Sequence, residues 1–334
     1  MAAIIFGCQR QPEYNFKSHL ECSDTLIAEY LETELYTSPY PDVFLAGEYF
    51  ITVSDLQKGF VQLLEKETGQ LISSTSNIGR GPDEMVSPRG QHYSQQLNKL
   101  LVSDNYIKKI FEYSILKDSI ELTSQITFPK HFFLKLIRSA NDTMFVALNY
   151  YPNQSIYLLT TQWETIDSIP YRSYSDPSLD YQVRYDNVYF DIVPEKKYIV
   201  VADHDMPLIK IYSYRDNKIE LLWEKLMAEQ LYHVENGKRK LHNDQINGFV
   251  SMALTKDYIY LTVTGGTIED WDKSYSNSGT GPEFLYLMIF DYKGRHQKTI
   301  YLKNSLNKII VTPDNKYLYG VNYNENQILK YSLK

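Results

Sequence analysis

Residues 192–201 read IVPEKKYIVV: an apolar pair, a short polar turn, and a run of aromatic and β-branched residues. Residues 310–321 repeat the same phrase as IVTPDNKYLYGV. Apolar runs on both sides of a short turn are typical of two antiparallel strands. The recurrence of this unit far along the chain indicates a protein built from repeated strand units.

The second half of this phrase recurs six times, and each copy is followed by another alternating run. The copies are YFITVSD (49–55), KLLVSDN (99–105), TMFVALN (143–149), KYIVVAD (197–203), DYIYLTV (257–263) and KYLYGVN (316–322). Their spacing of 44 to 60 residues matches blades of ~40–50 residues with loop insertions. The sequence predicts an all-β fold: one six-bladed β-propeller of four-stranded antiparallel blades over residues 25–334.

The last repeat ends at QILKYSLK (327–334), so the sixth blade lacks an outer strand. The segment TLIAEYLETELYT (25–37) can supply it, and pairing of the two ends would cover an exposed edge. The spacing of Leu26, Ile27, Tyr30 and Leu31 also fits one face of a helix. Residues 221–234, LLWEKLMAEQLYHV, form the main helix-like stretch elsewhere.

The composition indicates an ordinary globular protein, with 22% charged residues and a net charge of -7. This charge argues against a nucleic-acid partner, because phosphate neutralisation needs a concentrated basic face. The basic run at residues 238–240 is too short to change that conclusion. The 30 tyrosines suit strands and half-buried surfaces.

The first eight residues end in IFGC, which resembles a bacterial lipobox with Cys8 as the lipidated residue. The apolar stretch before Cys8 is shorter than a signal peptide and has no positively charged start. Either the start lies upstream or the match is accidental. We expect residues 1–24 to be a lipoprotein-like N-terminus and tether, and the protein to be an outer-membrane or periplasmic lipoprotein of the cell envelope. Contact with the membrane would then be made only through the lipid anchor.

Residues 76–88, SNIGRGPDEMVSP, connect the first blade to the second. Their GRGPDE segment resembles the G-x-G-P-G-E connector of the TolB-like six-bladed propellers of bacterial envelope lipoproteins, with Asp83 where glycine is usual. The resemblance implies this fold and location. In physical terms, Gly79 permits positive φ and Pro82 fixes the next φ, so the segment predicts a rigid corner. The alternative is a ligand contact through Arg80 or Glu84.

Strands alternate in direction, so inter-blade connectors and second-to-third-strand loops share one face. The long loops that belong there cover residues 75–96, 171–186, 203–207, 233–245 and 264–283. Function concentrates in loops held by a rigid scaffold. The candidate binding residues on this face are Arg80, Glu84, Tyr174, Tyr185, His204, Asp205, His242, Asp244, Trp271 and Asp272.

These residues leave two functions open. The first is a non-catalytic binding or scaffolding propeller that holds an envelope protein, a peptide or a glycan on the loop face, without a cofactor. The alternative is a metal-dependent hydrolase or lyase acting on lactones, sugars or peptides, with Ca²⁺ or Zn²⁺ held by histidines and carboxylates. The chain has no G-x-S-x-G motif and no recognised metal-ligand spacing, so we favour the first.

Overall fold

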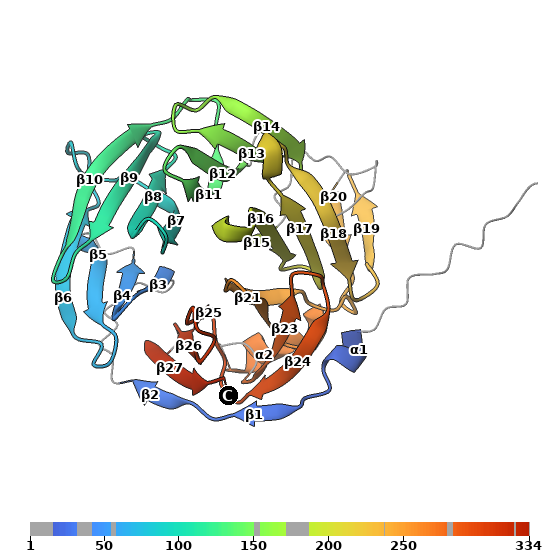
Figure 1. Cartoon of the computed structure of the whole chain (residues 1–334). Helices are drawn as coiled ribbons and strands as arrows, with labels where there is room; N and C mark the ends of the chain where they lie inside the picture. Colours follow the sequence, from blue (N-terminus) through green and yellow to red (C-terminus); the bar gives the residue numbers. More distant parts are fainter. Residues whose placement is uncertain are drawn as a thin grey trace, which may run out of the picture.

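The computed structural model describes residues 16–31, 42–54, 58–149, 154–171, 187–236, 238–278, 283–323 and 325–333. Six sheets of mainly antiparallel strands are arranged in a ring, and the described residues add one two-stranded hairpin (Figure 1). The first strand of each sheet lies nearest the centre of the ring and the later strands lie further out (Figure 1). The fold is the six-bladed β-propeller that the repeat predicted.

The blades follow one another along the chain, and each carries its strands in sequence order. Blade I contains β3 (Asp42–Ala46), β4 (Tyr49–Val53), β5 (Lys58–Glu65) and β6 (Leu71–Asn77). Blade II contains β7 (Pro88–Ser94), β8 (Lys99–Asp104), β9 (Lys109–Ile115) and β10 (Ile120–Thr127). Blade III contains β11 (Leu134–Asn141), β12 (Met144–Asn149), β13 (Ser155–Thr160) and β14 (Thr165–Pro170).

The second half of the ring carries the insertions. Blade IV contains β15 (Val188–Val193), β16 (Tyr198–Asp203), β17 (Leu208–Ser213) and β18 (Glu220–Leu226). A hairpin of β19 (Tyr232–Glu235) and β20 (Lys238–Leu241) precedes blade V, which contains β21 (Phe249–Leu254), β22 (Tyr258–Val263), β23 (Leu285–Asp291) and β24 (His296–Leu302). Helix α2 (Ile268–Ser278) lies between β22 and β23, and blade VI contains β25 (Lys308–Val311), β26 (Tyr317–Asn322) and β27 (Gln327–Ser332).

The N-terminal segment closes the ring. Strand β2 (Glu29–Leu31) pairs antiparallel with β27 as the outer strand of blade VI, with Tyr30 opposite Leu329. Strand β1 (Asp24–Leu26) adds a parallel fifth strand to blade V beside β24. The strand alternative for this segment is therefore confirmed over the helical one. The strand is favoured because it forms hydrogen bonds with the backbone N–H and C=O groups on the outer edge of β27. A helix would leave those groups unpaired.

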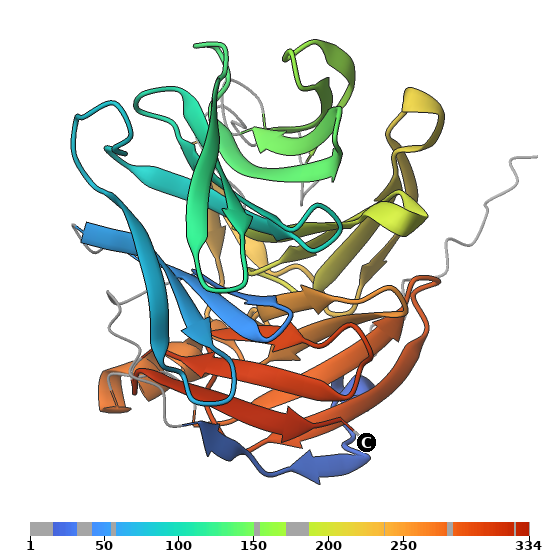
Figure 2. The same cartoon turned by 60° about the vertical axis from the view of Figure 1, so that its left-hand side comes forward.

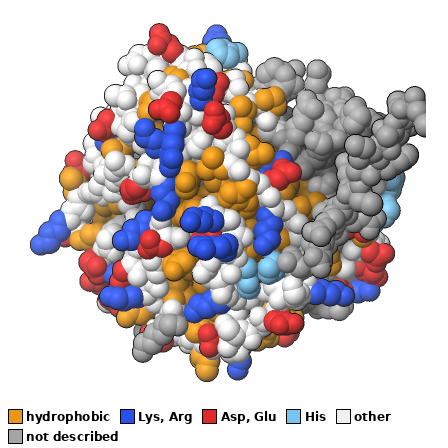
Figure 3. All heavy atoms as spheres, turned by 45° about the vertical axis from the view of Figure 1, so that its right-hand side comes forward, with side chains coloured by type: hydrophobic (Ala, Val, Ile, Leu, Met, Phe, Trp, Pro, Cys, Tyr) orange, Lys and Arg blue, Asp and Glu red, His pale blue; other side chains and the backbone are white. Residues whose placement is uncertain are grey.

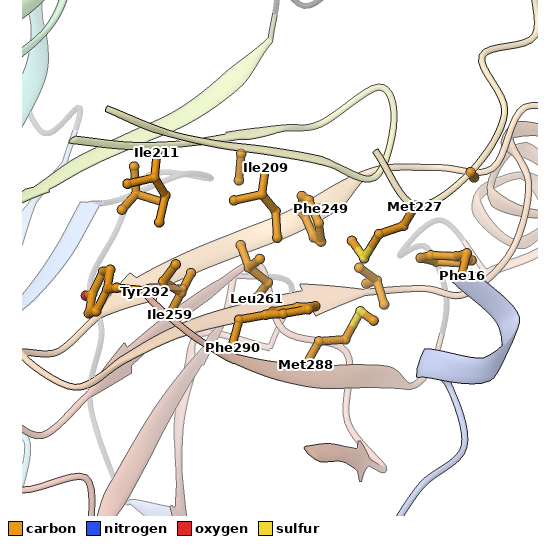
Figure 4. Packing of buried hydrophobic residues seen from close by; sticks show 14 of the residues in the cluster. Phe16, Ile209, Ile211, Met227, Phe249, Ile259, Leu261, Met288, Phe290 and Tyr292 are labelled. Atoms are coloured by element: carbon orange, nitrogen blue, oxygen red, sulfur yellow. The ribbon is translucent and has the colours of Figure 1, made fainter. Parts of the chain in front are cut away.

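The core consists of apolar side chains packed between neighbouring blades. Between blades IV and V, side chains of β17 meet side chains of β21, β22 and β23 (Figure 4). Phe16, from the short helix α1 (Phe16–His19), closes one end of this cluster beside Met227 (Figure 4). A single sheet has no partner for both of its faces, so the blades need one another to remove apolar surface from water.

We expect His19 to make the fold less stable as the pH falls from about 6.5 toward 4. His19 is the last residue of α1, and the centre of its ring lies 4.6 Å from the centre of the His296 ring. Burial, followed by the positive charges of Lys225 and His296, lowers the pKa of His19 to about 4. The unfolded chain takes up a proton near pH 6.5, whereas the folded protein resists protonation until about pH 4, so acid favours unfolding over this interval.

Denaturant unfolding at about pH 7 and about pH 4.5 checks this expectation. The His19→Gln variant should lose less stability between the two pH values than the wild-type protein does. His131→Gln, at an exposed position, is the control and should follow the wild type. An equal loss of stability in wild type and His19→Gln would contradict the assignment.

The helix-like stretch at residues 221–234 is not helical. It forms all but the first residue of β18 and the beginning of β19. Here the pairing of β18 with β17 in the blade overrides the local helical spacing. The longest helix of the described residues is α2, a largely polar segment whose apolar residues Ile268, Trp271 and Tyr275 recur at helical spacing. No helix in the described part of the chain is long and apolar enough to cross a membrane.

Two faces of the ring can be distinguished. The loop-rich face carries the inter-blade connectors and the loops between second and third strands, whereas the turn face carries the other turns of each blade. Figure 2 shows α2 (orange) on one side of the ring and the turn after β15 (yellow-green) on the other. The insertion that carries α2 therefore lies on the loop-rich face, as the strand alternation predicted, whereas residues 172–186 lie outside the described residues.

Candidate ligand-binding site

A polar residue at the end of the second strand orders the loop-rich face in several blades. Asp104, which is fully buried, accepts hydrogen bonds from the backbone N–H groups of Val86, Ser87, Tyr106 and Ile107 at 2.7–3.2 Å. The side-chain oxygens of Asn149, Asp203 and Asn322 accept backbone N–H groups at the equivalent strand ends. These residues fix the loops on which the candidate site residues lie.

The connector between blades I and II is a structural corner. The Glu84 carboxylate accepts the N–H of Gly81 at 2.7 Å, and Met85 is fully buried. A Cβ at Gly79 would lie 2.0 Å from Oε2 of Glu84. Gly79 does not use the positive φ that glycine permits; glycine is required here because a side chain would collide with the Glu84 carboxylate. Glu84 thus holds its own turn, and Arg80 is exposed beside it.

His204 and Asp205 lie together in the loop after β16. The Nδ1 atom of His204 is 3.5 Å from Asp205 Oδ1, and the Arg239 guanidinium donates to the other Asp205 oxygen. Burial raises the pKa of Asp205, but the hydrogen bond from His204 and the charge of Arg239 outweigh burial and hold it below the usual value. Asp205 is therefore an ionised anchor for the β19–β20 hairpin.

His242 and Asp244 follow this hairpin and are exposed. The His242 ring lies 5.5 Å from that of His233. Between the two candidates and β21, the fully buried Gln245 accepts the N–H of Leu231 and donates to the carbonyl of Ile246, both at 2.7 Å. The connector is ordered by Gln245, and His242 and Asp244 are presented on its surface.

A cleft of about 550 Å³ lies beside α2 at the loop-rich end of blade V. Its lining residues are Leu20, Thr264, Gly265, Gly266, Asp270, Trp271, Ser274, Glu283, Phe284 and Tyr286. The insertion after β22 contributes one wall through Trp271, and the start of β23 contributes the other through Phe284 and Tyr286. Clefts of this size with mostly apolar walls and a few polar groups are typical of small-molecule sites.

The aromatic wall of this cleft is preorganised by ring contacts. The rings of Phe284 and Tyr286 meet edge to face at 5.9 Å, and each lies within 6 Å of the Tyr301 ring.

The Asp270 carboxylate of the cleft is held by Thr267, whose N–H and hydroxyl both donate to Oδ2 at 2.9 Å. These hydrogen bonds lower the pKa of Asp270, so a carboxylate sits at the helix start beside the rings.

The structure brings only some of the predicted residues together. His204 and Asp205 are neighbours, and Trp271 lines the cleft, whereas Asp272 is exposed outside its lining. Arg80 and Glu84 lie in the separate connector between blades I and II. Tyr174, Tyr185 and Cys8 lie outside the described residues.

Three cleft residues and one anchor escaped the sequence reasoning. Phe284 and Tyr286 alternate at the start of a strand, FLYLMIF, and this alternation could have placed them on one side of the strand. Leu20 precedes the propeller, and no pattern in the sequence identifies it as a cleft residue. Arg239 belongs to the short basic run at residues 238–240, which gave no hint that its guanidinium is buried against Asp205.

The described residues contain no group of three histidine, cysteine, aspartate or glutamate side chains placed to hold a metal ion. The described parts of the candidate set therefore provide pairs, such as His204 with Asp205, and no converging ligand cluster.

A second cavity of about 540 Å³ follows the centre of the ring and is lined by the inner strands. Among its lining residues Arg138, from β11, donates to Asp191 Oδ1 at 2.8 Å and to the carbonyls of Gln91 and Phe190. His92 lies 3.9 Å from the same Asp191 oxygen. Burial, followed by the charges of Arg138 and Lys308, holds the pKa of His92 well below its usual range. These contacts join blades II, III and IV across the channel.

The search of curated protein sequences found no match. Among solved structures, the chain is similar to a "putative exported protein" of Bacteroides fragilis NCTC 9343, with a TM-score of 0.59, 11% identity, and coverage of 94% of this chain and 97% of that one. It is also similar to a member of the duf4221 family from Bacteroides vulgatus, with a TM-score of 0.57, 12% identity, and coverage of 92% and 97%.

A third similar structure is the β-propeller domain of Cps50 (Swd1) from Myceliophteria thermophila. Its TM-score is 0.51 at 11% identity, with coverage of 92% of this chain and all of that domain. At these identities the likenesses show the fold alone. The family comparison is more specific, because the model of one family, described as TolB-like 6-blade propeller-like, matches residues 27–314. The chain therefore belongs to the TolB-like family of six-bladed propellers.

Proposed function

We propose that this protein is a non-catalytic binding propeller of the bacterial cell envelope, and that its loop-rich face holds a glycan in the cleft beside α2. The observation that carries the proposal is the pairing of Trp271 with the aromatic wall of Phe284 and Tyr286 in one cleft of about 550 Å³. Flat rings with polar groups at their margin suit the apolar faces and hydroxyls of a sugar.

The polar groups of the cleft suit a neutral ligand with hydroxyl groups. Asp270 and Glu283 can accept hydrogen bonds, and Ser274 and Thr264 offer hydroxyls along the same lining. The carboxylates would repel an anionic ligand. A peptide is the second class of ligand that this cleft could hold, and the binding test below distinguishes a peptide from a glycan.

The state of the other candidate residues supports a binding role over catalysis. Glu84 accepts a hydrogen bond from its own turn and Asp205 pairs with Arg239, so these two carboxylates stabilise the fold. A general acid or base must instead reach a substrate proton.

Placement in the envelope is supported by the description of the Bacteroides fragilis protein as exported. Lipidation at Cys8 is part of this proposal, and mass analysis of the protein from its native membrane tests it.

Replacing Trp271 with alanine should weaken glycan binding about tenfold, because a lost aromatic contact of about 1.5 kcal/mol corresponds to that factor. Calorimetric titration with neutral β-1,4-linked tetrasaccharides of glucose, mannose, xylose and N-acetylglucosamine measures the affinity. Trp271→Phe should lose less, since it keeps a ring. Trp223→Phe, at the boundary of blades IV and V on β18, is the matched control and should bind as the wild type does.

Three results would overturn the proposed function. The first is an affinity for every tetrasaccharide that Trp271→Ala leaves unchanged. The second is binding of peptides, in place of glycans, that Trp271→Ala weakens. The third is metal-dependent hydrolysis of a lactone, sugar or peptide that is abolished by His242→Ala or Asp244→Ala, which would establish the enzyme alternative.

A further inference from the structure

Three turns of blades IV and V form a basic patch on the turn face, opposite the loop-rich face. They are residues 194–197, residues 214–219 and residues 292–295. Together they hold six lysines and arginines against two carboxylates: Lys196, Lys197, Arg215, Lys218, Lys293 and Arg295 against Glu195 and Asp216. This local excess of positive charge occurs in a chain whose net charge is -7.

The three turns meet around two tyrosine rings. Arg215 donates to the carbonyl of Lys196 at 3.4 Å, and its guanidinium lies 5.4 Å from the centre of the Tyr198 ring. The Lys196 ammonium lies 5.3 Å from the Tyr292 ring, and the two rings are 5.8 Å apart. Cation–π contacts of this kind hold long side chains in place, which reduces the entropy lost when a partner binds.

The excess of positive charge is confined to this sector of the turn face. The eight other turns of the face carry seven carboxylates and four lysines: Glu48, Glu67, Asp118, Asp142, Glu164, Asp257 and Asp314 against Lys66, Lys117, Lys256 and Lys316. A flat anionic membrane would meet these acidic turns as well as the basic patch. The distribution therefore fits a narrow anionic partner better than a lipid surface.

An apolar strand edge adjoins the basic patch. Strand β18 begins two residues after Lys218 and exposes Leu221 by 49% and Leu222 by 46%. No further strand pairs with β18 among the described residues, whereas β1 and β2 cover the outer strands of blades V and VI. Figure 3 shows Lys and Arg side chains beside hydrophobic ones on this side of the molecule. An open edge with apolar side chains can accept an added strand.

We propose that the basic patch and the β18 edge bind an acidic, extended peptide segment of a partner protein. Its backbone would pair with β18, its apolar side chains would cover Leu221 and Leu222, and its carboxylates would meet Arg215, Lys218 and Lys293. A polysaccharide fits less well, because Tyr292 is buried and the faces of Tyr292 and Tyr198 are covered by Lys196 and Arg215. In addition, Leu221 and Leu222 cannot form hydrogen bonds with the hydroxyl groups of a sugar.

The probe is a fluorescein-labelled peptide of alternating glutamate and valine, titrated with the full chain and followed by fluorescence anisotropy. The Arg215→Glu/Lys218→Glu/Lys293→Glu variant should weaken binding by a factor of ten or more, and added salt should weaken wild-type binding. Leu221→Ser/Leu222→Ser should weaken binding about threefold or more. The matched control, Lys117→Glu/Lys256→Glu/Lys316→Glu, reverses three exposed charges on the same face and should bind within about twofold of wild type.

Hydrogen exchange of the wild-type chain tests the same site without substitutions, and the peptide should slow exchange in β18. The proposal is overturned if the acidic peptide shows no saturable binding, or if the control variant loses as much affinity as the patch variant. It is also overturned if polygalacturonate or vesicles containing phosphatidylglycerol bind through the patch while the peptide does not. A peptide of alternating lysine and valine should not bind, and equal binding of both peptides would contradict the charge assignment.

Discussion

Replacing Arg138 with alanine should destabilise the propeller by about 3 kcal/mol, the lower end of the range for breaking a buried ion pair, because Arg138 is buried whereas the Asp191 side chain is 36% exposed. The Arg138 side chain is 10% exposed and donates to acceptors from two neighbouring blades as well as to the carbonyl of Ile137. Alanine would leave Asp191 without its cation and leave buried carbonyls unsatisfied. Urea unfolding of purified protein measures the loss.

Arg138→Lys should lie between wild type and alanine, because lysine keeps the charge but lacks the planar fork that reaches several acceptors at once. Lys117→Ala, at an exposed turn of blade II, is the control and should change stability by less than about 0.5 kcal/mol. A loss below about 1 kcal/mol for Arg138→Ala would show that these contacts do not join the blades.

Gly248→Ala should cost about 3 kcal/mol, at the upper end of overpacking effects. A Cβ at this position would lie 2.3 Å from the carbonyl oxygen of Asp203 and 2.4 Å from that of Met206. Both neighbours are backbone atoms, so no side-chain rotation can relieve the clash. The N–H of Gly248 also donates to the carbonyl of His204 at 3.0 Å, so the loop bearing His204 and Asp205 would have to move.

Thermal unfolding checks this expectation, with Gly47→Ala as the matched glycine control. Gly47 has no heavy atom within 4 Å of its would-be Cβ, but its φ of +62° strains alanine. That strain alone is worth about 1 kcal/mol. Equal losses at the two glycines would mean that the close approach at Gly248 contributes nothing.

The blades could be predicted from the sequence because each repeats one local pattern. Second strands such as Tyr198–Asp203 are buried along nearly their whole length, so they appear as continuous apolar runs bounded by turns. The closing strand was ambiguous, since residues 25–31 fit a strand and a helix equally. Only the unpaired edge of β27, at the other end of the chain, decides between them.

The candidate site was predicted in part. Trp271 was identified because it lies in the longest insertion, and the structure places it in the cleft. Its partners Phe284 and Tyr286 follow the helix and lie opposite Trp271 only because β22 and β23 pair. The roles of Glu84 and Arg138 depend on atoms within hydrogen-bonding distance, and no residue pattern along the chain specifies those neighbours.

The sequence alone determined the number of blades, the class of fold and the face that carries the long loops, because strand periodicity and repeat spacing are local properties. Tertiary structure decided the ring closure, the contacts of Arg138 across the channel, the cleft at Trp271 and the basic patch. The ring closure, the Arg138 contacts and the basic patch join residues from different blades or from the two ends of the chain, and the cleft joins blade V to Leu20 of the N-terminal segment. Such contacts form only when the ring closes, so spacing along the chain does not encode them.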